Sequence, residues 1–126
     1  MVGTNELERL TKFYEAVFGK APDMSEDKYK GWLVGSTFFT VGEHDQMKGK
    51  AKEGARVMFN LETPDVKQEF ERIKAIEGAE VIKEPYEMSA EGEATGESGF
   101  WIATFADPDG NYFQLMSPWE PDNNAN

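Results

Sequence analysis

The single histidine of the chain is the first residue that could do chemistry. His44 stands between Glu43 and Asp45, and an imidazole beside two carboxylates can bind a metal ion or act as a general base. The same three residues are also typical of a polar turn in contact with solvent. We favour the turn, because one histidine limits imidazole chemistry and a chain without cysteine offers no thiolate ligand.

A pair of carboxylates near the C-terminus is the second candidate. Asp107 and Asp109 lie in the segment Asp-Pro-Asp-Gly-Asn and look like a pair suited to acid–base chemistry. In a turn of this composition, however, aspartates more often accept hydrogen bonds from nearby backbone groups. We therefore interpret this segment as a turn that joins two strands.

Two segments with alternating side chains predict a binding surface. Large apolar residues recur at every second position from Arg56 to Glu62 and from Tyr112 to Met116, as in strands with two different faces. We expect the apolar sets to pack against helices, namely Val57, Phe59, Leu61, Phe113 and Leu115.

The other faces of these two strands carry amide, phenol, thioether and carboxylate groups. If they converge on one cleft, they can bind an organic molecule by stacking and hydrogen bonds, and a carboxylate can attract a cationic group. The alternative is that they face solvent or a dimer contact. The predicted ligand contacts are Met58, Asn60, Glu62, Tyr112 and Gln114.

The charge of the chain restricts its partners. Among 126 residues, 24 are acidic and 13 are basic, which gives a net charge of −11 at pH 7. An acidic protein repels phosphate backbones and anionic lipids, so we expect neither nucleic acid nor a membrane as a partner. A neutral or cationic small molecule fits better. The apolar runs are only a few residues long, so we expect no membrane span, no secretory signal and a cytoplasmic protein.

Two amphipathic helices, one in each half of the chain, indicate an internal repeat. The first begins near Thr4 with Asn5 as its cap and ends at Gly19. The second begins with Thr63 as its cap and ends at Gly78. A shift of 59 residues places Thr4 on Thr63 and Gly19 on Gly78. This coincidence predicts a duplicated unit.

Strand patterns surround the helices, so each half reads as a strand, a helix and three strands. The repeat places most of the first strand before residue 1 and leaves only residues 1–3, so we expect either a very short first strand or a chain that begins late. A stretch rich in Gly, Ser, Ala and Glu between 88 and 99 predicts a mobile loop and candidate lid. The tail at 121–126 is expected to be disordered. Other strands are predicted at 29–34, 36–41, weakly at 46–50, and at 56–62, 80–83, 100–106 and 112–116.

Four segments carry a resemblance to a known superfamily: Phe13-Tyr-Glu-Ala-Val-Phe-Gly19, Asn60-Leu-Glu-Thr-Pro-Asp-Val66, Gly78-Ala-Glu-Val81 and Phe105-Ala-Asp-Pro-Asp-Gly-Asn-Tyr-Phe-Gln-Leu115. Together they resemble the glyoxalase / bleomycin-resistance / extradiol-dioxygenase superfamily, also called the vicinal oxygen chelate (VOC) superfamily. The resemblance covers most of the chain, and the last segment is the most specific. It implies an α+β fold in which two βαβββ modules form a curved mixed sheet around a cleft, usually in a homodimer. We therefore expect one glyoxalase-like domain over 1–120, with modules at about 1–52 and 55–118.

The resemblance also bears on metal binding. Metal-dependent members hold a divalent ion with His, Gln or Glu residues on the opening and closing strands of each module. Where they have a histidine on the opening strand of the second module, this chain has Met58, and where they have a closing-strand glutamate it has Gln114. One further position falls before residue 1, and the fourth has no assignment. A thioether and an amide are poor ligands for a hard divalent ion, so we expect no metal and no cofactor.

Two classes of function stay open. The first is metal-free binding of a small neutral or cationic organic molecule, similar to the drug-sequestering members of the superfamily. The alternative is a metal-dependent glyoxalase-like lyase or isomerase, or a dioxygenase, acting on a small oxygenated substrate with an ion held by Gln114, Glu62 or His44. The sequence assigns no catalytic residue, and it leaves open whether any reaction is catalysed.

Overall fold

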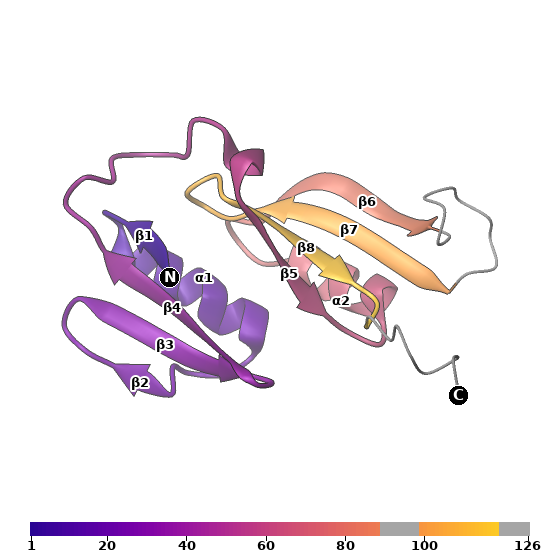
Figure 1. The fold of residues 1–126 in the computed structure, drawn as a ribbon, viewed down its shortest axis with the longest axis horizontal. Helices are drawn as coiled ribbons and strands as arrows, with labels where there is room; N and C mark the ends of the chain where they lie inside the picture. The colour runs from indigo at the N-terminus through magenta and orange to yellow at the C-terminus, as the bar shows by residue number, and fades with distance from the viewer. Residues whose placement is uncertain (89–98, 119–126) are drawn as a thin grey trace.

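The computed structural model describes residues 1–88 and 99–118 (Figure 1). The predicted lid lies, except for its end residues, outside the described residues, as does the predicted tail. The described chain forms two four-stranded sheets and two helices. The predicted α+β class is therefore confirmed.

Both halves of the chain have the same topology. In the first sheet the strand order is β1-β4-β3-β2, and in the second sheet it is β5-β8-β7-β6, with the two outer strands β1 and β5 parallel to β4 and β8. The predicted repeat is confirmed. The first module consists of β1 (Val2–Thr4), α1 (Leu7–Phe18), β2 (Met24–Ser25), β3 (Tyr29–Val34) and β4 (Thr37–Glu43). The second consists of β5 (Met58–Glu62), α2 (Val66–Lys74), β6 (Glu80–Met88), β7 (Phe100–Ala106) and β8 (Tyr112–Met116).

The repeat extends to the turn that precedes each helix. The hydroxyl of Thr4 accepts the N–H of Glu6 at 2.9 Å, and the hydroxyl of Thr63 accepts the N–H of Asp65 at 3.2 Å. The predicted caps were wrong, because these turns move the start of the first helix by one position and that of the second by two. Glu6 and Asp65 are the N-cap residues, and the Asp65 carboxylate accepts the N–H of Gln68 at 3.1 Å. Neither described helix is long and apolar enough to cross a membrane.

Three strand predictions need correction. Residues 46–50 form no strand, and the short β2 completes the first sheet instead. The strand predicted to close before Pro85 continues to Met88, because β6 is an edge strand that can accommodate a proline, with register shifts between Val81 and Tyr86. Val57 precedes β5 and is 77% exposed, so it does not pack against the helices as expected.

A single apolar core joins the two modules. Both helices lie on the same side of the sheets in Figure 1, and α1 contacts both sheets. The Tyr14 ring lies 4.8 Å from that of Phe39 on β4 and 6.1 Å from those of Phe59 and Phe113 on the second sheet. Helices therefore cover one face of each sheet, and we call the other face the open face.

The second helix also stabilises the end of the first. Arg72 donates hydrogen bonds to the carbonyl oxygens of Ala16 at 2.8 Å and Val17 at 2.6 Å. The last turn of a helix has carbonyl groups without partners inside the helix, and a guanidinium satisfies two of them here. The two helices are thus held in a fixed relation to each other.

Candidate functional site

The residues predicted to bind a ligand lie together on the open face of the second sheet. In the parallel pair β5–β8, Met58 stands opposite Tyr112 and Asn60 stands opposite Gln114. Neighbouring strands are about 4.8 Å apart, so the Asn60 and Gln114 side chains are direct neighbours. The predicted alternation of faces is confirmed for these residues, while their role as ligand contacts stays a prediction.

A row of polar side chains crosses the middle of this open face. Gln114 also pairs with Thr104 on β7, and its Nε2 donates to the Thr104 hydroxyl at 3.3 Å. Thr104 is only 6% exposed, whereas Asn60 is exposed and Gln114 is half-buried. Within the described residues, the Gln114 side chain has no other hydrogen bond, so its carbonyl oxygen is available to an incoming molecule.

The open face of the first sheet is apolar rather than polar. Tyr29 and Leu33 project from it with exposed fractions of 43% and 54%, and Phe38 is 48% exposed. The Phe38 ring lies so close to Gly31 that a Cβ placed there would be 2.6 Å from the ring. The two open faces therefore differ in chemistry although the strands beneath them are equivalent.

The equivalence of the two modules identifies the fourth metal-site position, to which the sequence alone assigned no residue. Thr40 on β4 is the counterpart of Gln114 on β8. Each stands two residues before the second member of a strand pair that occupies the same place in its module. These pairs are Gly3 with Gly42 in the first sheet and Glu62 with Met116 in the second.

The donors at the positions of the superfamily's metal site do not fit a hard divalent ion. The three positions that the chain contains hold the thioether of Met58, the amide of Gln114 and the hydroxyl of Thr40. None carries a charge, and divalent ions of this kind prefer imidazole or carboxylate ligands. In residues 1–88 and 99–118 no group of three or more His, Cys, Asp or Glu side chains is placed to hold an ion. His44 lies in an exposed turn, where its Nδ1 accepts the N–H of Gln46 at 3.2 Å.

Two open cavities lie away from the polar row. One, of about 1310 Å³, follows the first half of α1 and reaches Pro108 and residues 76–78. The other, of about 610 Å³, lies beside the segment that connects the two modules. Of the predicted ligand contacts, Tyr112 alone lines this second cavity.

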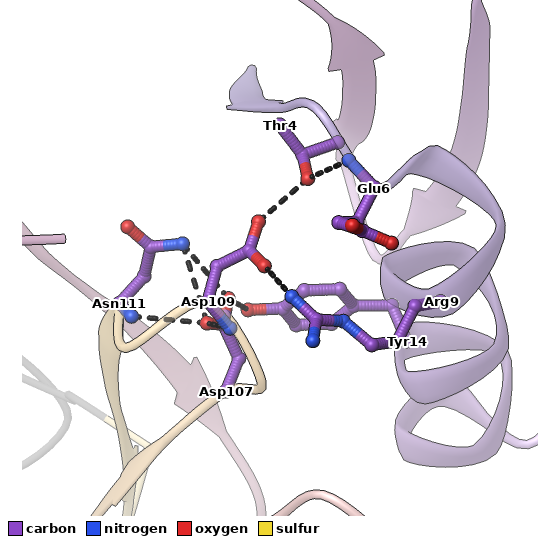
Figure 2. A network of polar contacts seen from close by, with 7 residues as sticks. All are labelled: Thr4, Glu6, Arg9, Tyr14, Asp107, Asp109 and Asn111. Atoms are coloured by element: carbon purple, nitrogen blue, oxygen red, sulfur yellow. Dashed lines mark hydrogen bonds and ion pairs between the residues drawn. The ribbon is translucent and has the colours of Figure 1, made fainter. Parts of the chain in front are cut away.

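The carboxylates of the Asp-Pro-Asp-Gly-Asn turn link the two modules (Figure 2). Asp107 accepts the N–H groups of Asp109 and Asn111, both at 2.9 Å, as predicted for a local turn. It also accepts the hydroxyl of Tyr14 from α1 at 2.7 Å. This contact between modules was not predicted, although a tyrosine on the apolar face of a helix needs a partner for its hydroxyl.

Asp109 carries the second carboxylate of the turn. Among the described side chains, only those of the first module donate hydrogen bonds to it. Asp109 is 4% exposed and accepts the hydroxyl of Thr4 at 2.6 Å and the Nη2 of Arg9 at 2.6 Å. Charged groups can be buried when they are paired and hydrogen-bonded in this way. The pair therefore has a structural role, and no geometry around it indicates acid–base chemistry.

Burial changes the ionisation of this network. Loss of solvent raises the pKa of the Asp107 carboxyl above its usual 3.8, against the opposing effect of hydrogen bonds from Tyr14, Asn111 and Asp109. Burial, followed by the nearby Asp107 charge, raises the pKa of the Tyr14 phenol well above 10.0. The phenol is therefore a hydrogen-bond donor throughout the physiological pH range.

Comparison with known proteins identifies the family that has this architecture. The family described as the glyoxalase-like domain matches residues 1–116 of the chain. The chain belongs to this glyoxalase-like family. The predicted membership of the VOC superfamily is thereby confirmed. No curated protein sequence matches the chain.

Solved structures agree with the glyoxalase-like fold. A glyoxalase/bleomycin resistance protein from Albidiferax ferrireducens T118 is 22% identical, with a TM-score of 0.68 over 94% of this chain and 95% of that chain. A hypothetical protein from S. aureus is 26% identical, with a TM-score of 0.66 over 93% and 89% of the two chains. The fosfomycin resistance protein FosX from Mesorhizobium loti is 19% identical, with a TM-score of 0.64 over 94% and 87%.

The raised pKa of Asp107 predicts a specific pH dependence of stability. Because the folded state holds this proton more tightly than the unfolded chain, the stabilising contribution is complete below pH 3.8 and is lost as the pH rises through the folded-state pKa. The free energy of unfolding of the native glyoxalase-like domain, relative to Asp107→Asn, should therefore fall as the pH rises through this window. Urea unfolding at a series of pH values measures the difference.

Asp23 provides a control with the opposite sign. Hydrogen bonds from Lys20 and from the Leu33 N–H lower the pKa of its carboxyl, so its contribution is present above pH 3.8 and is lost as the pH falls. Relative to Asp23→Asn, the native chain should gain stability with rising pH. If both variants showed the same trend, burial would not control the titration of Asp107.

Proposed function

We propose that this glyoxalase-like protein binds a small neutral or cationic organic molecule, without a metal ion, on the open face of its second sheet. The observation that carries the proposal is the row formed by Asn60, Gln114 and Thr104. It presents amide donors and acceptors on a surface whose neighbouring positions are a phenol ring and a thioether. Such a combination binds polar organic molecules by hydrogen bonds and stacking.

Charge supports the preference for a neutral or cationic ligand. Glu62 is exposed at the end of β5, on the same face as Asn60, and can attract a cationic group at that end of the row. The net charge of −11 raises the local concentration of cations around the whole protein. The names of the similar structures, which include bleomycin resistance and fosfomycin resistance proteins, agree with binding of small organic molecules.

The polar row can be tested by truncating its amides. We expect that a screen of neutral and cationic organic compounds by thermal shift finds ligands that raise the melting temperature. Gln114→Ala and Asn60→Ala should each weaken their binding by about fivefold, because each removes a hydrogen bond worth about 1 kcal/mol. Isothermal titration calorimetry measures the dissociation constants.

Gln46→Ala is the matched control for these variants. It removes the same amide from an exposed position of the connecting segment and should leave ligand affinity unchanged. Ligands that bind Gln114→Ala and Asn60→Ala as tightly as the native chain would contradict the proposed site.

Metal content separates this proposal from the metal-dependent alternative. Because Met58, Gln114 and Thr40 provide no charged ligand, the purified protein should contain far less than one Ni, Zn, Mn or Fe ion per chain by elemental analysis. The double variant Met58→His with Gln114→Glu places an imidazole and a carboxylate on the same face and should take up more metal. About one tightly bound ion per native chain would instead favour a glyoxalase-like enzyme.

The apolar open face of the first sheet supports our further proposal of a homodimer. Tyr29, Leu33 and Phe38 form an exposed apolar surface over strands that are only partly covered, and a second copy of the chain can bury it. Light scattering at micromolar concentration should give a mass of twice 14.2 kDa. Leu33→Glu with Phe38→Glu should shift the protein toward the monomer, because the two charges would be desolvated at the interface.

Val57→Glu is the control for the dimer experiment. Val57 is also apolar and exposed, but it precedes β5 and so lies outside the first sheet. This variant should keep the mass of the native protein. A stable monomer for the native chain at micromolar concentration would contradict the proposed assembly.

A further inference from the structure

The segment that connects the two modules has the opposite charge to the rest of the protein. Four of the 13 basic residues fall between positions 48 and 56, where a single acidic residue, Glu53, occurs. The basic residues are Lys48, Lys50, Lys52 and Arg56. A local positive charge on a chain with a net charge of −11 marks a place where a negative group can be bound.

This connecting segment is fixed against the second module. The N–H of Ala51 donates to the carbonyl oxygen of Asp109 at 2.7 Å. Gly54 lies so close to the same turn that a Cβ placed there would be 2.1 Å from the Gly110 carbonyl oxygen and 2.7 Å from the Tyr112 ring. Contact this close requires a residue without a side chain, so Lys52 and Arg56, which flank Gly54, are positioned on a defined surface.

The fixed segment forms one wall of the cavity of about 610 Å³, and the residues that line it can bind an anion. Its lining consists of Lys52, Glu53, Gly54, Ala55, Arg56 and Tyr112. The volume falls in the range of small-molecule sites, which is about 300–1,000 Å³.

Two cationic groups of this cavity can donate hydrogen bonds to a ligand. The Arg56 Nε and Nη2 both donate to Glu53, which leaves Nη1 without a partner in the described part of the chain. Lys52 forms no ion pair within residues 1–88 and 99–118. Tyr112 also lines the cavity and carries a hydroxyl donor. A guanidinium, an ammonium and a phenol together form the donor set that carboxylate and phosphate groups prefer.

We propose that this cavity binds the carboxylate or phosphate group of a small molecule through Lys52, Arg56 and Tyr112. The site is distinct from the polar row of Asn60 and Gln114, and its existence does not depend on the function proposed for that row. Because Tyr112 stands beside Met58 on the open face, an anionic group held here would lie next to the proposed ligand surface. The acidic remainder of the chain restricts this site to small anions and disfavours polyanions.

Titration with simple anions tests the site directly. Inorganic phosphate and acetate are added separately to ¹⁵N-labelled protein at constant ionic strength, and amide chemical shifts are recorded. We expect saturable shifts concentrated at residues 52–56 and Tyr112 for at least one anion, and the tighter of the two identifies the preferred group. Lys52→Gln and Arg56→Gln should each weaken binding by about fivefold, because an exposed charged partner is lost.

Two further variants make the outcome decisive. Glu53→Gln removes the carboxylate that competes for Arg56 and should tighten anion binding about threefold. Lys28→Gln removes one charge from an exposed site outside the cavity and should change nothing. Shifts spread over the whole surface, equal weakening by Lys28→Gln, or native affinity in Lys52→Gln would each overturn the proposal. Unchanged phosphate or acetate binding in Gln114→Ala separates this result from that of the polar row.

Discussion

The burial of two carboxylates between the modules is the constraint on which the rest of the structure depends. Asp107 and Asp109 are 3% and 4% exposed, and a buried carboxylate without partners costs several kcal/mol. Their partners come from the turn itself and from Thr4, Arg9 and Tyr14 at the start of the first module. These hydrogen bonds therefore hold the two modules in the relative arrangement that the structure shows.

In the same arrangement, the open faces of the two sheets differ in chemistry. Equivalent positions of the repeat carry Gln114 and Thr104 in the second sheet but Thr40 and Gly31 in the first, so one open face is polar and the other apolar. The sheet faces covered by helices have aromatic packing in both modules, since Tyr14 contacts rings from each. Divergence of the repeat is thus concentrated on the surfaces that do not contribute to the shared core.

Local patterns in the sequence predicted most of the fold and the register of the site. Alternation predicted that Asn60 shares a face with Met58 and Glu62, and Gln114 with Tyr112, because strand side chains have a fixed period of two. That Asn60 stands opposite Gln114 is known only from the structure. The pattern could not predict β2, since two residues carry no period, nor the passage of β6 through Pro85, which depends on its edge position. The contacts of Asp107 with Tyr14 and of Asp109 with Arg9 join residues about a hundred positions apart, which no local pattern encodes.

The length of those connections also has a consequence for how the chain folds. Within each module, strands and helix are close in sequence, so each sheet can form early at a small cost in loop-closure entropy. The polar network spans separations of 93 to 105 residues and joins Thr4 and the helix α1 of the first module to the turn between β7 and β8 of the second. Docking of two preformed modules, sealed by these hydrogen bonds, is therefore the expected final step of folding, and the rate of that step is sensitive to the connecting segment.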